Sequence, residues 1–524
     1  MLPVANTQLG PGSLAAILGG VFEGGEDTIW IHPDPNFNDE IVFNPEHPNW
    51  LLHKELLKAC KAKANGNYFV GMPDLMEGLD VLAALKGTDM VLLDTVMQSE
   101  VLEQQMQQIN DIYFKVFDEL YDIIREGDEM AFCYFSSWAP GKMSKLQSDI
   151  STMISQDDYR RFVQPFIREQ CQKIDYTLYH LDGVGAMHHL PALLGIEELN
   201  AIQWTPGVGE PQGGSPKWYD LYKKILAGGK SVMACWVTLE ELKPLLDHIG
   251  ADGVHLEMDF HNEREVEQAM RIIEEYTGSS SSVSADVHTN QPVGEQDNAQ
   301  ESIRIREEKS QEEDRMKPLY DAIVAGKLEP AVEVTKDAIA AGVLPQDIIN
   351  GYMITAMGEV GQRFQDGKAF VPQLLMAGRA MKGALELLKP YMENDKNTIS
   401  LGKVVIGTVK GDLHDIGKNL VSSMLEGCGF EVINLGVDVS DEKFVEAAKE
   451  HKANIVCMSA LLTTTMVYMK EVIKAFEKAG IRNDVKIMIG GAPLSEKFAE
   501  EIGADGYSDN ANAAVTLARK LLNK

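Results

Sequence analysis

The hydrophobic and polar positions divide the chain into two halves. Through the first half, short apolar runs alternate with segments whose apolar residues recur every three or four positions. Repeated strand–helix units predict a parallel sheet, and their number favours a (β/α)8 barrel over residues 1–276. Residues 1–27 are punctuated by Gly and Pro, so we expect the first strand to be missing, in a barrel that is permuted, decorated or incomplete at its N-terminus. The expected strands are 68–71, 90–94, 131–135, 176–180, 200–204, 231–236 and 253–258, with a hairpin arm at 28–31.

The second half begins with a change of composition. Residues 277–314 start with a stretch rich in Ser, Asn, Gln and Gly, which predicts a flexible linker. Residues 315–395 hold four amphipathic helical segments, a pattern typical of a four-helix bundle. Residues 400–524 return to strand–helix alternation and predict a flavodoxin-like doubly wound sheet, which binds ligands at the carboxyl ends of its strands. Its expected strands are 403–409, 430–436, 454–460, 485–491 and 504–508.

Charge and composition exclude several classes of function. The chain has 48 Lys and Arg against 79 Asp and Glu, a net charge of −31. Such a balance disfavours nucleic acids and anionic membrane surfaces as partners. The chain shows no signal peptide and no apolar stretch of about 18 residues, and its six cysteines form no CxxC pair. We therefore expect a cytoplasmic protein with free thiols.

The strongest chemical motif is G-D-L-H-D-I-G-K-N at residues 411–419, between a predicted strand and a predicted helix. Asp412, His414 and Gly417 form D-x-H-x-x-G. A histidine in such a loop can bind a metal, and a nearby carboxylate can hold its other ring nitrogen. Further candidate residues end the third and fourth predicted strands, where glycine permits close approach. They are Ser459, Leu461, Gly490 and Gly491.

These residues resemble the cobalamin-binding domains of methionine synthase and of the corrinoid proteins of anaerobic methyl transfer, over residues 315–524. The resemblance implies bound cobalamin with His414 as the lower cobalt ligand. Thr465 stands where methionine synthase has a relay serine. In residues 362–381, Phe370 and Leu374 resemble the side chains that shield the corrin ring. The alternative is a plain flavodoxin-like module, with His414 in a helix-capping loop and these two side chains in the bundle core.

The first half carries four motifs at predicted strand ends: SSWAPG (136–141), LQSD (146–149), YHLDG (179–183) and IQWTPG (202–207). They resemble the uroporphyrinogen decarboxylase-like superfamily, especially its corrinoid methyltransferase branch. Decarboxylation of a porphyrinogen is not expected, because all six arginines of this half fall in predicted helices rather than in the cleft.

The resemblance implies a zinc site at the barrel mouth, with a departure from the usual ligands. Asp182 replaces cysteine in the His180-Leu-Asp182 segment, and residues 257–262 contain no cysteine. A hard nitrogen and oxygen site of His180, Asp182 and Glu257, with His261 nearby, remains as one interpretation. The other is that these are substrate-binding or hydrogen-bonded cleft residues. The candidate catalytic residues are Asp149, His180, Asp182 and Glu257.

Together, the two resemblances predict a cobalamin-dependent methyltransferase. The barrel would move a methyl group from a small methylated O- or N-donor to Co(I), supplying orientation and leaving-group activation. The implied partners are this substrate, a second methyltransferase or methyl acceptor, and a reductive activator. The alternative is a methyl carrier that serves separate methyltransferases, with the barrel inactive or working on the acceptor side. A cobalamin-dependent sensor is disfavoured because no basic helix-turn-helix is evident.

Overall fold

The chain folds into two compact units, Met1–Gly278 and Ser279–Lys524, which are described separately. No helix in the described part of the chain is long and apolar enough to cross a bilayer. Most of the predicted linker, residues 278–308, lies outside the described residues, as does Ser136 of the first motif. The computed structural model describes residues 4–5, 12–24, 29–33, 37–76, 78–135, 137–207, 209–277, 309–392, 401–412, 414, 416–491 and 493–522.

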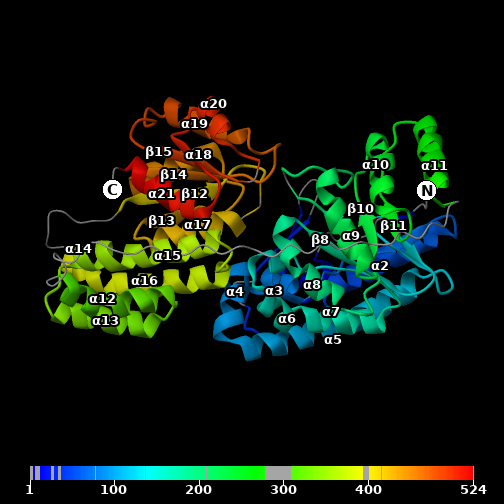
Figure 1. Ribbon diagram of the computed structural model, residues 1–524, viewed down its shortest axis with the longest axis horizontal. Helices are drawn as coiled ribbons and strands as arrows, with labels where there is room; N and C mark the ends of the chain where they lie inside the picture. Colours follow the sequence, from blue (N-terminus) through cyan, green and yellow to red (C-terminus); the bar gives the residue numbers. More distant parts are fainter. Residues whose placement is uncertain are drawn as a thin grey trace, which may run out of the picture. The chain divides into compact units, whose positions relative to one another are not determined.

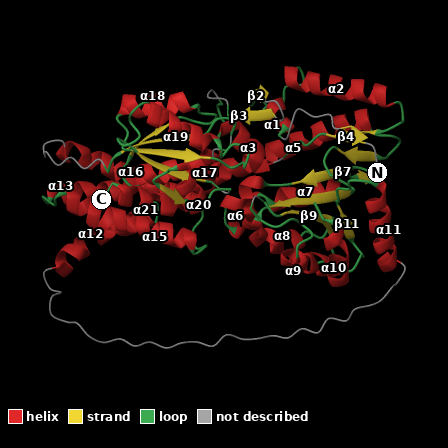
Figure 2. Cartoon of the chain, turned by 90° about the horizontal axis from the view of Figure 1, so that it is seen from above, coloured by secondary structure: helices red, strands yellow, loops and turns green. Residues whose placement is uncertain are grey.

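The first unit contains two largely parallel sheets whose strands follow the sequence order (Figure 2). One sheet has the order β1-β4-β5-β6, with β6 antiparallel at its edge, and the other runs β11-β10-β9-β8-β7. Among the described residues no ladder joins β5 to β7 or β11 to β1, so the predicted closed barrel is not confirmed. The strands are β1 (Val4–Ala5), β4 (Phe69–Met72), β5 (Met130–Phe132), β6 (Trp138–Ala139), β7 (Met143–Leu146), β8 (Tyr176–Asp182), β9 (Ala201–Thr205), β10 (Ser231–Ala234) and β11 (Val254–Leu256).

Helices and short helical turns connect these strands, and the expected hairpin forms from β2 (Val21–Gly24) and β3 (Ile29–His32). The helices are α1 (Ser13–Ile17), α2 (Pro48–Ala64), α3 (Gly78–Lys86), α4 (Thr88–Met97), α5 (Ser99–Ile124), α6 (Gln156–Phe162), α7 (Gln164–Lys173), α8 (Leu190–Leu194), α9 (Tyr219–Ala227), α10 (Leu239–Ile249) and α11 (Glu263–Thr277). The 3-10 turns are η1 (Asp149–Met153), η2 (Val184–His189) and η3 (Pro216–Trp218).

Three sequence-based expectations for this unit are wrong. A first strand is present, because β1 pairs in parallel with β4. Residues 90–94 lie in helix α4 rather than in a strand, since a short apolar run does not by itself distinguish a buried helix from a strand. Strand β7 was not among the expected strands, and it contains Lys145. This lysine is buried against Asp74, with side-chain exposures of 4% and 3%.

The second unit begins with the four-helix bundle that the periodicity predicts. Its third helical segment contains a π-helical stretch, η4, between α14 and α15. A single hydrophobic core joins the bundle to one face of the following sheet. The bundle elements are α12 (Lys309–Val324), α13 (Leu328–Ala340), α14 (Pro345–Ile348), η4 (Ile349–Met353), α15 (Ile354–Gln365) and α16 (Val371–Met392).

The sheet of the second unit has the parallel order β13-β12-β14-β15-β16, which is the flavodoxin-like arrangement (Figure 1). Helices α17 and α21 share the core with the bundle, and α18, α19 and α20 cover the other face. The strand order reverses at β12, so the crevice at the carboxyl ends of β12 and β14 is where this fold binds ligands. The elements are β12 (Lys403–Thr408), α17 (Ile416–Gly427), β13 (Glu431–Asn434), α18 (Asp441–His451), β14 (Ile455–Ser459), α19 (Tyr468–Lys478), β15 (Lys486–Gly490), α20 (Glu496–Ile502), β16 (Gly506–Ser508) and α21 (Ala511–Leu521).

Candidate functional site

The loop after β12 is held in place by hydrogen bonds to the neighbouring strand ends. Gly411 adopts a φ of 78°, and its N–H donates to Asp438 Oδ1 at 2.7 Å. The Thr408 hydroxyl donates to the carbonyl oxygen of His414 at 2.9 Å. These contacts fix the backbone on both sides of Asp412, whose side chain points into the protein and is fully buried.

Asp412 is the centre of a hydrogen-bond network that includes His414. Its Oδ1 accepts from the ring Nδ1 of His414 at 2.7 Å and from the His414 backbone N–H at 3.1 Å. Its Oδ2 accepts from the Thr465 hydroxyl at 2.6 Å and from the backbone N–H of Leu461 at 2.8 Å. The structure thus brings three of the sequence-predicted residues into direct contact, together with the backbone of a fourth.

This network decides which ring nitrogen of His414 faces the carboxylate. Burial by itself raises the pKa of Asp412, but hydrogen bonds from His414, Thr465 and backbone N–H groups outweigh burial and hold that pKa well below its usual range. The ionised carboxylate therefore accepts the Nδ1 proton of His414, and the ring lone pair is on Nε2. A neutral imidazole oriented by a carboxylate is a good metal ligand. The donor set fits a cobalt ion bound through His414 Nε2.

The other predicted residues of this site lie at the strand ends beside the loop. Ser459, at the end of β14, is in register with Thr408 of β12 on one side and with Gly490 of β15 on the other. A Cβ on Gly491, whose φ is 145°, would lie 1.9 Å from the carbonyl oxygen of Ala460, so the chain's own packing requires this glycine. A Cβ on Gly417 would meet nothing within 4 Å, so there is open space beside the first turn of α17.

Phe370 and Leu374 lie where α16 begins. Leu374 is 2% exposed and belongs to the core shared by the bundle and the sheet, whereas Phe370 is half-buried. In this arrangement Leu374 packs within the protein. Of the two, only Phe370 keeps part of its surface exposed to a ligand.

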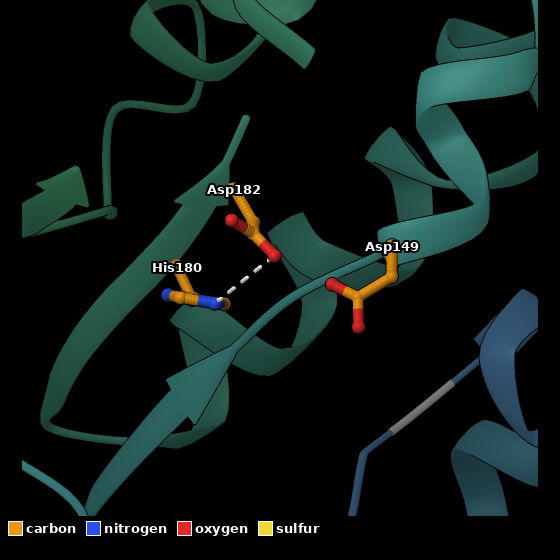
Figure 3. Close-up of side chains that lie close together, drawn as sticks. All are labelled: Asp149, His180 and Asp182. Atoms are coloured by element: carbon orange, nitrogen blue, oxygen red, sulfur yellow. Dashed lines mark ion pairs between the residues drawn. The ribbon is translucent and has the colours of Figure 1, made fainter. Parts of the chain in front are cut away.

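The first unit has a second cluster at the carboxyl end of β8 (Figure 3). His180 and Asp182 lie on one face of β8, and Asp149 begins η1 directly after the β7 segment. One ligand atom from each lies within 4.8 Å of the others, and His180 Nε2 is 4.0 Å from Asp182 Oδ2. One imidazole and two carboxylates make a hard donor set, which fits zinc with an open position.

Gln203, which the sequence analysis did not select, orients His180. It is fully buried, and its Nε2 donates to Thr205 Oγ1 at 2.8 Å and to Cys235 Sγ at 3.1 Å. Its Oε1 therefore accepts from His180 Nδ1. The lone pair of His180 is consequently on Nε2, which faces Asp182. The position of Gln203 within the IQWTPG motif was the signal for it in the sequence.

Burial and neighbouring charge set the protonation of this cluster. Asp80 accepts from the backbone N–H groups of Asp149 at 2.8 Å and Ile150 at 2.9 Å, and burial raises the pKa of Asp80 to about 6. Asp149 is exposed by its surface area, yet protein atoms surround its carboxyl group. That enclosure, followed by the charge of Asp80, raises the pKa of Asp149 well above its usual range. Burial and then Lys145 lower the pKa of His180, which favours its neutral form.

The remaining residues proposed for this site lie apart from the cluster. Glu257 is not among its three members, and the buried Oε2 of Glu257 has no hydrogen-bond partner in the described part of the chain. Instead, Glu257 interacts with the thiol of Cys235. His261 is exposed, and its backbone N–H donates to Glu265 at 2.9 Å. The cluster thus contains three of the four candidate catalytic residues, Asp149, His180 and Asp182.

Comparison with known proteins relates the second unit to characterised families. Two family models, both described as a B12 binding domain, match residues 402–516 and 316–389. Trimethylamine corrinoid protein 1 of Methanosarcina acetivorans is 46% identical over 203 residues, which are 38% of this chain and 94% of that protein. The dimethylamine corrinoid protein of Methanosarcina barkeri is 42% identical over 210 residues, 40% of this chain and 98% of that protein.

Among solved structures, the methanol:cobalamin methyltransferase complex MtaBC from Methanosarcina barkeri is 30% identical to the chain. The match covers 43% of this chain and 86% of that one, with a TM-score of 0.36. Because the structural match is this weak, it carries no argument beyond the family matches.

Proposed function

Since the chain belongs, through its second unit, to the corrinoid proteins with a B12-binding domain, we propose that its first unit loads the cobalamin of the second with a methyl group. The methyl donor would be a small molecule methylated on oxygen or nitrogen. The observation that carries this proposal is the presence, in one chain, of the Asp412–His414 pair and the Asp149–His180–Asp182 cluster.

In the second unit, His414 would hold the cobalt through Nε2, and Asp412 and Thr465 would keep the Nδ1 proton in place. When bound, the corrinoid supplies a cobalt centre that accepts a methyl group and passes it on. Open space beside Gly417 and the strand ends at Ser459 and Gly490 would accommodate the cofactor. Phe370 would approach the corrin ring from the bundle.

In the first unit, the cluster would activate the leaving group of the methyl donor. A carboxyl group with a raised pKa keeps its proton to a higher pH than an ordinary aspartate, so Asp149 would give a proton to the departing oxygen or nitrogen. His180, held neutral and oriented by Gln203, and Asp182 would position the donor. Zinc on the three side chains would activate the same leaving group as a Lewis acid, and metal analysis of the purified protein distinguishes the two.

The test is methyl transfer by the full chain loaded with cobalamin and reduced to Co(I). Its visible absorbance is followed while methylamines, methoxylated aromatics and methanol are added one at a time. We expect one donor class to react, and the rate to fall by about a hundredfold in Asp149→Asn and His180→Ala. Asp157→Asn, which changes an exposed carboxylate with 96% side-chain exposure, serves as the matched control.

A methyl carrier for separate methyltransferases is the second candidate function. It is favoured by the comparisons, because the second unit alone spans 94% of a trimethylamine corrinoid protein. If no donor changes the absorbance of the full chain, but an added methyltransferase does, the carrier function is supported and the donor role of the first unit is rejected.

A further inference from the structure

The second unit contains a cavity of about 320 Å³ between α15, α17 and α21. Helix α17 begins beside the Asp412 loop, but the cavity is lined by Met424 from its last turn and by Cys428, which directly follows the helix. In a doubly wound fold each helix runs back across the sheet, so its last turn lies at the amino ends of the strands. The cavity is therefore separate from the corrinoid site.

One end of this cavity is positively charged. Arg519 and Lys520, from the last turn of α21, line it, and no Asp or Glu does. The Nε atom of Arg519 is buried and has no hydrogen-bond partner among the described residues. Basic residues in the last turn of a helix interact favourably with the helix dipole, but the dipole supplies no hydrogen-bond acceptor for this buried N–H. The missing acceptor indicates a negatively charged or strongly polar ligand atom.

Apart from Thr516, the rest of the cavity lining is apolar. Ile354 and Met357 of α15, Met424 of α17 and Val515 of α21 form its walls. Its volume lies at the lower end of the range for small-molecule sites. A ligand that fits both parts has an anionic head for Arg519 and a compact apolar body.

We propose that this cavity binds a small carboxylate with an apolar body, whose carboxylate is held by Arg519 and Lys520. A guanidinium matches a carboxylate in charge and geometry. Because α15 belongs to the bundle while α17 and α21 belong to the sheet layer, the ligand would touch both parts. Binding would therefore stabilise the packing of the bundle on the sheet. The site does not depend on the activity proposed for the first unit.

Calorimetric titration of the full chain with benzoate tests the proposal. Benzamide, which has the same shape without the charge, and inorganic phosphate, which has charge without the apolar body, are titrated in parallel. Benzoate should bind at least tenfold more tightly than either. No binding of benzoate, or tighter binding of benzamide or phosphate, overturns the assigned ligand class.

Two variants locate the site by different means. Arg519→Gln should weaken benzoate binding at least tenfold. Gly358→Leu adds a side chain on the lining helix α15, where a Cβ meets nothing within 4 Å, and should block binding while leaving both cations in place. Lys470→Gln, on the exposed side of α19, makes the same charge change elsewhere and should bind like the wild type. Unchanged binding by Gly358→Leu would show that benzoate binds outside this cavity.

Discussion

Asp412 and Thr465 lie 53 residues apart in the sequence and are joined by a hydrogen bond of 2.6 Å. The same carboxylate accepts the ring N–H of His414 at 2.7 Å. The loop after β12 and the loop after β14 are thus tied through one buried carboxylate. A change in either loop is therefore transmitted to the histidine that is proposed to bind cobalt.

Replacing this carboxylate should weaken cofactor binding. Asp412→Asn removes the charge that orients His414, and the loss of such a partner typically lowers metal affinity by about 10–100-fold. Thr465→Val removes one hydrogen bond and should have a smaller effect. Absorbance titration of the apoprotein with cobalamin measures both. Asp484→Asn, an exposed carboxylate in the same unit, should bind like the wild type. Equal affinities in all three variants would contradict the proposed role of Asp412.

Two glycine variants should separate folding from cofactor binding. Gly491→Ala places a Cβ 1.9 Å from a carbonyl oxygen at a positive φ, so it should destabilise the second unit by roughly 2–4 kcal/mol. Gly417→Ala meets nothing within 4 Å and should leave the thermal unfolding of that unit within a few degrees of the wild type. If the open space receives the cofactor, Gly417→Ala should nevertheless bind cobalamin more weakly. Wild-type affinity in Gly417→Ala would argue against a cofactor at this position.

The stability of the first unit should decrease as the pH falls from about 6.5 to 4. Burial lowers the pKa of His53 to about 4, and both ring nitrogens are buried without a partner in the described residues. Below pH 6.5, the ordinary pKa of histidine, His53 is protonated in the unfolded chain but stays neutral in the folded state. The free energy of unfolding therefore decreases as the pH falls, until His53 is also protonated in the folded state near pH 4. The loss is of the order of 3 kcal/mol.

Urea unfolding at several pH values measures this effect. His53→Leu should flatten the pH dependence, while His261→Leu, at an exposed position, should leave it unchanged. An equally steep pH dependence in His53→Leu would assign the effect to other groups.

Gln203 should act on the first-unit cluster through His180. Gln203→Leu removes the partner of the His180 N–H and of the buried Cys235 Sγ. Each buried group left unsatisfied costs about 1–3 kcal/mol of unfolding free energy. Gln203→Glu keeps an acceptor for His180. In the methyl-transfer assay, Gln203→Leu should be slowed more than tenfold and Gln203→Glu should recover part of the rate. Equal rates in both variants would exclude an orienting role.

The sequence by itself determined most of the second unit. The bundle and the doubly wound sheet have long, regular apolar periods, and Asp412 and His414 are only two residues apart along the chain. The first unit was less predictable. Residues 90–94 have the composition of a buried strand but form a helix, and β1 is only two residues long. Segments of two to five residues are too short for the local sequence pattern to distinguish a strand from a helix or a loop.

Only the tertiary structure decided which side chains meet in the first unit. Strand alternation correctly places His180 and Asp182 on one face, but it does not say which loop approaches that face. That loop begins with Asp149 rather than carrying Glu257, and Asp80 holds it through two backbone N–H groups. The buried Lys145–Asp74 pair and Gln203 were likewise invisible, since a polar residue is recognisable as a core residue only once its partner is known. Partners distant in sequence are brought together by the fold, which no local pattern encodes.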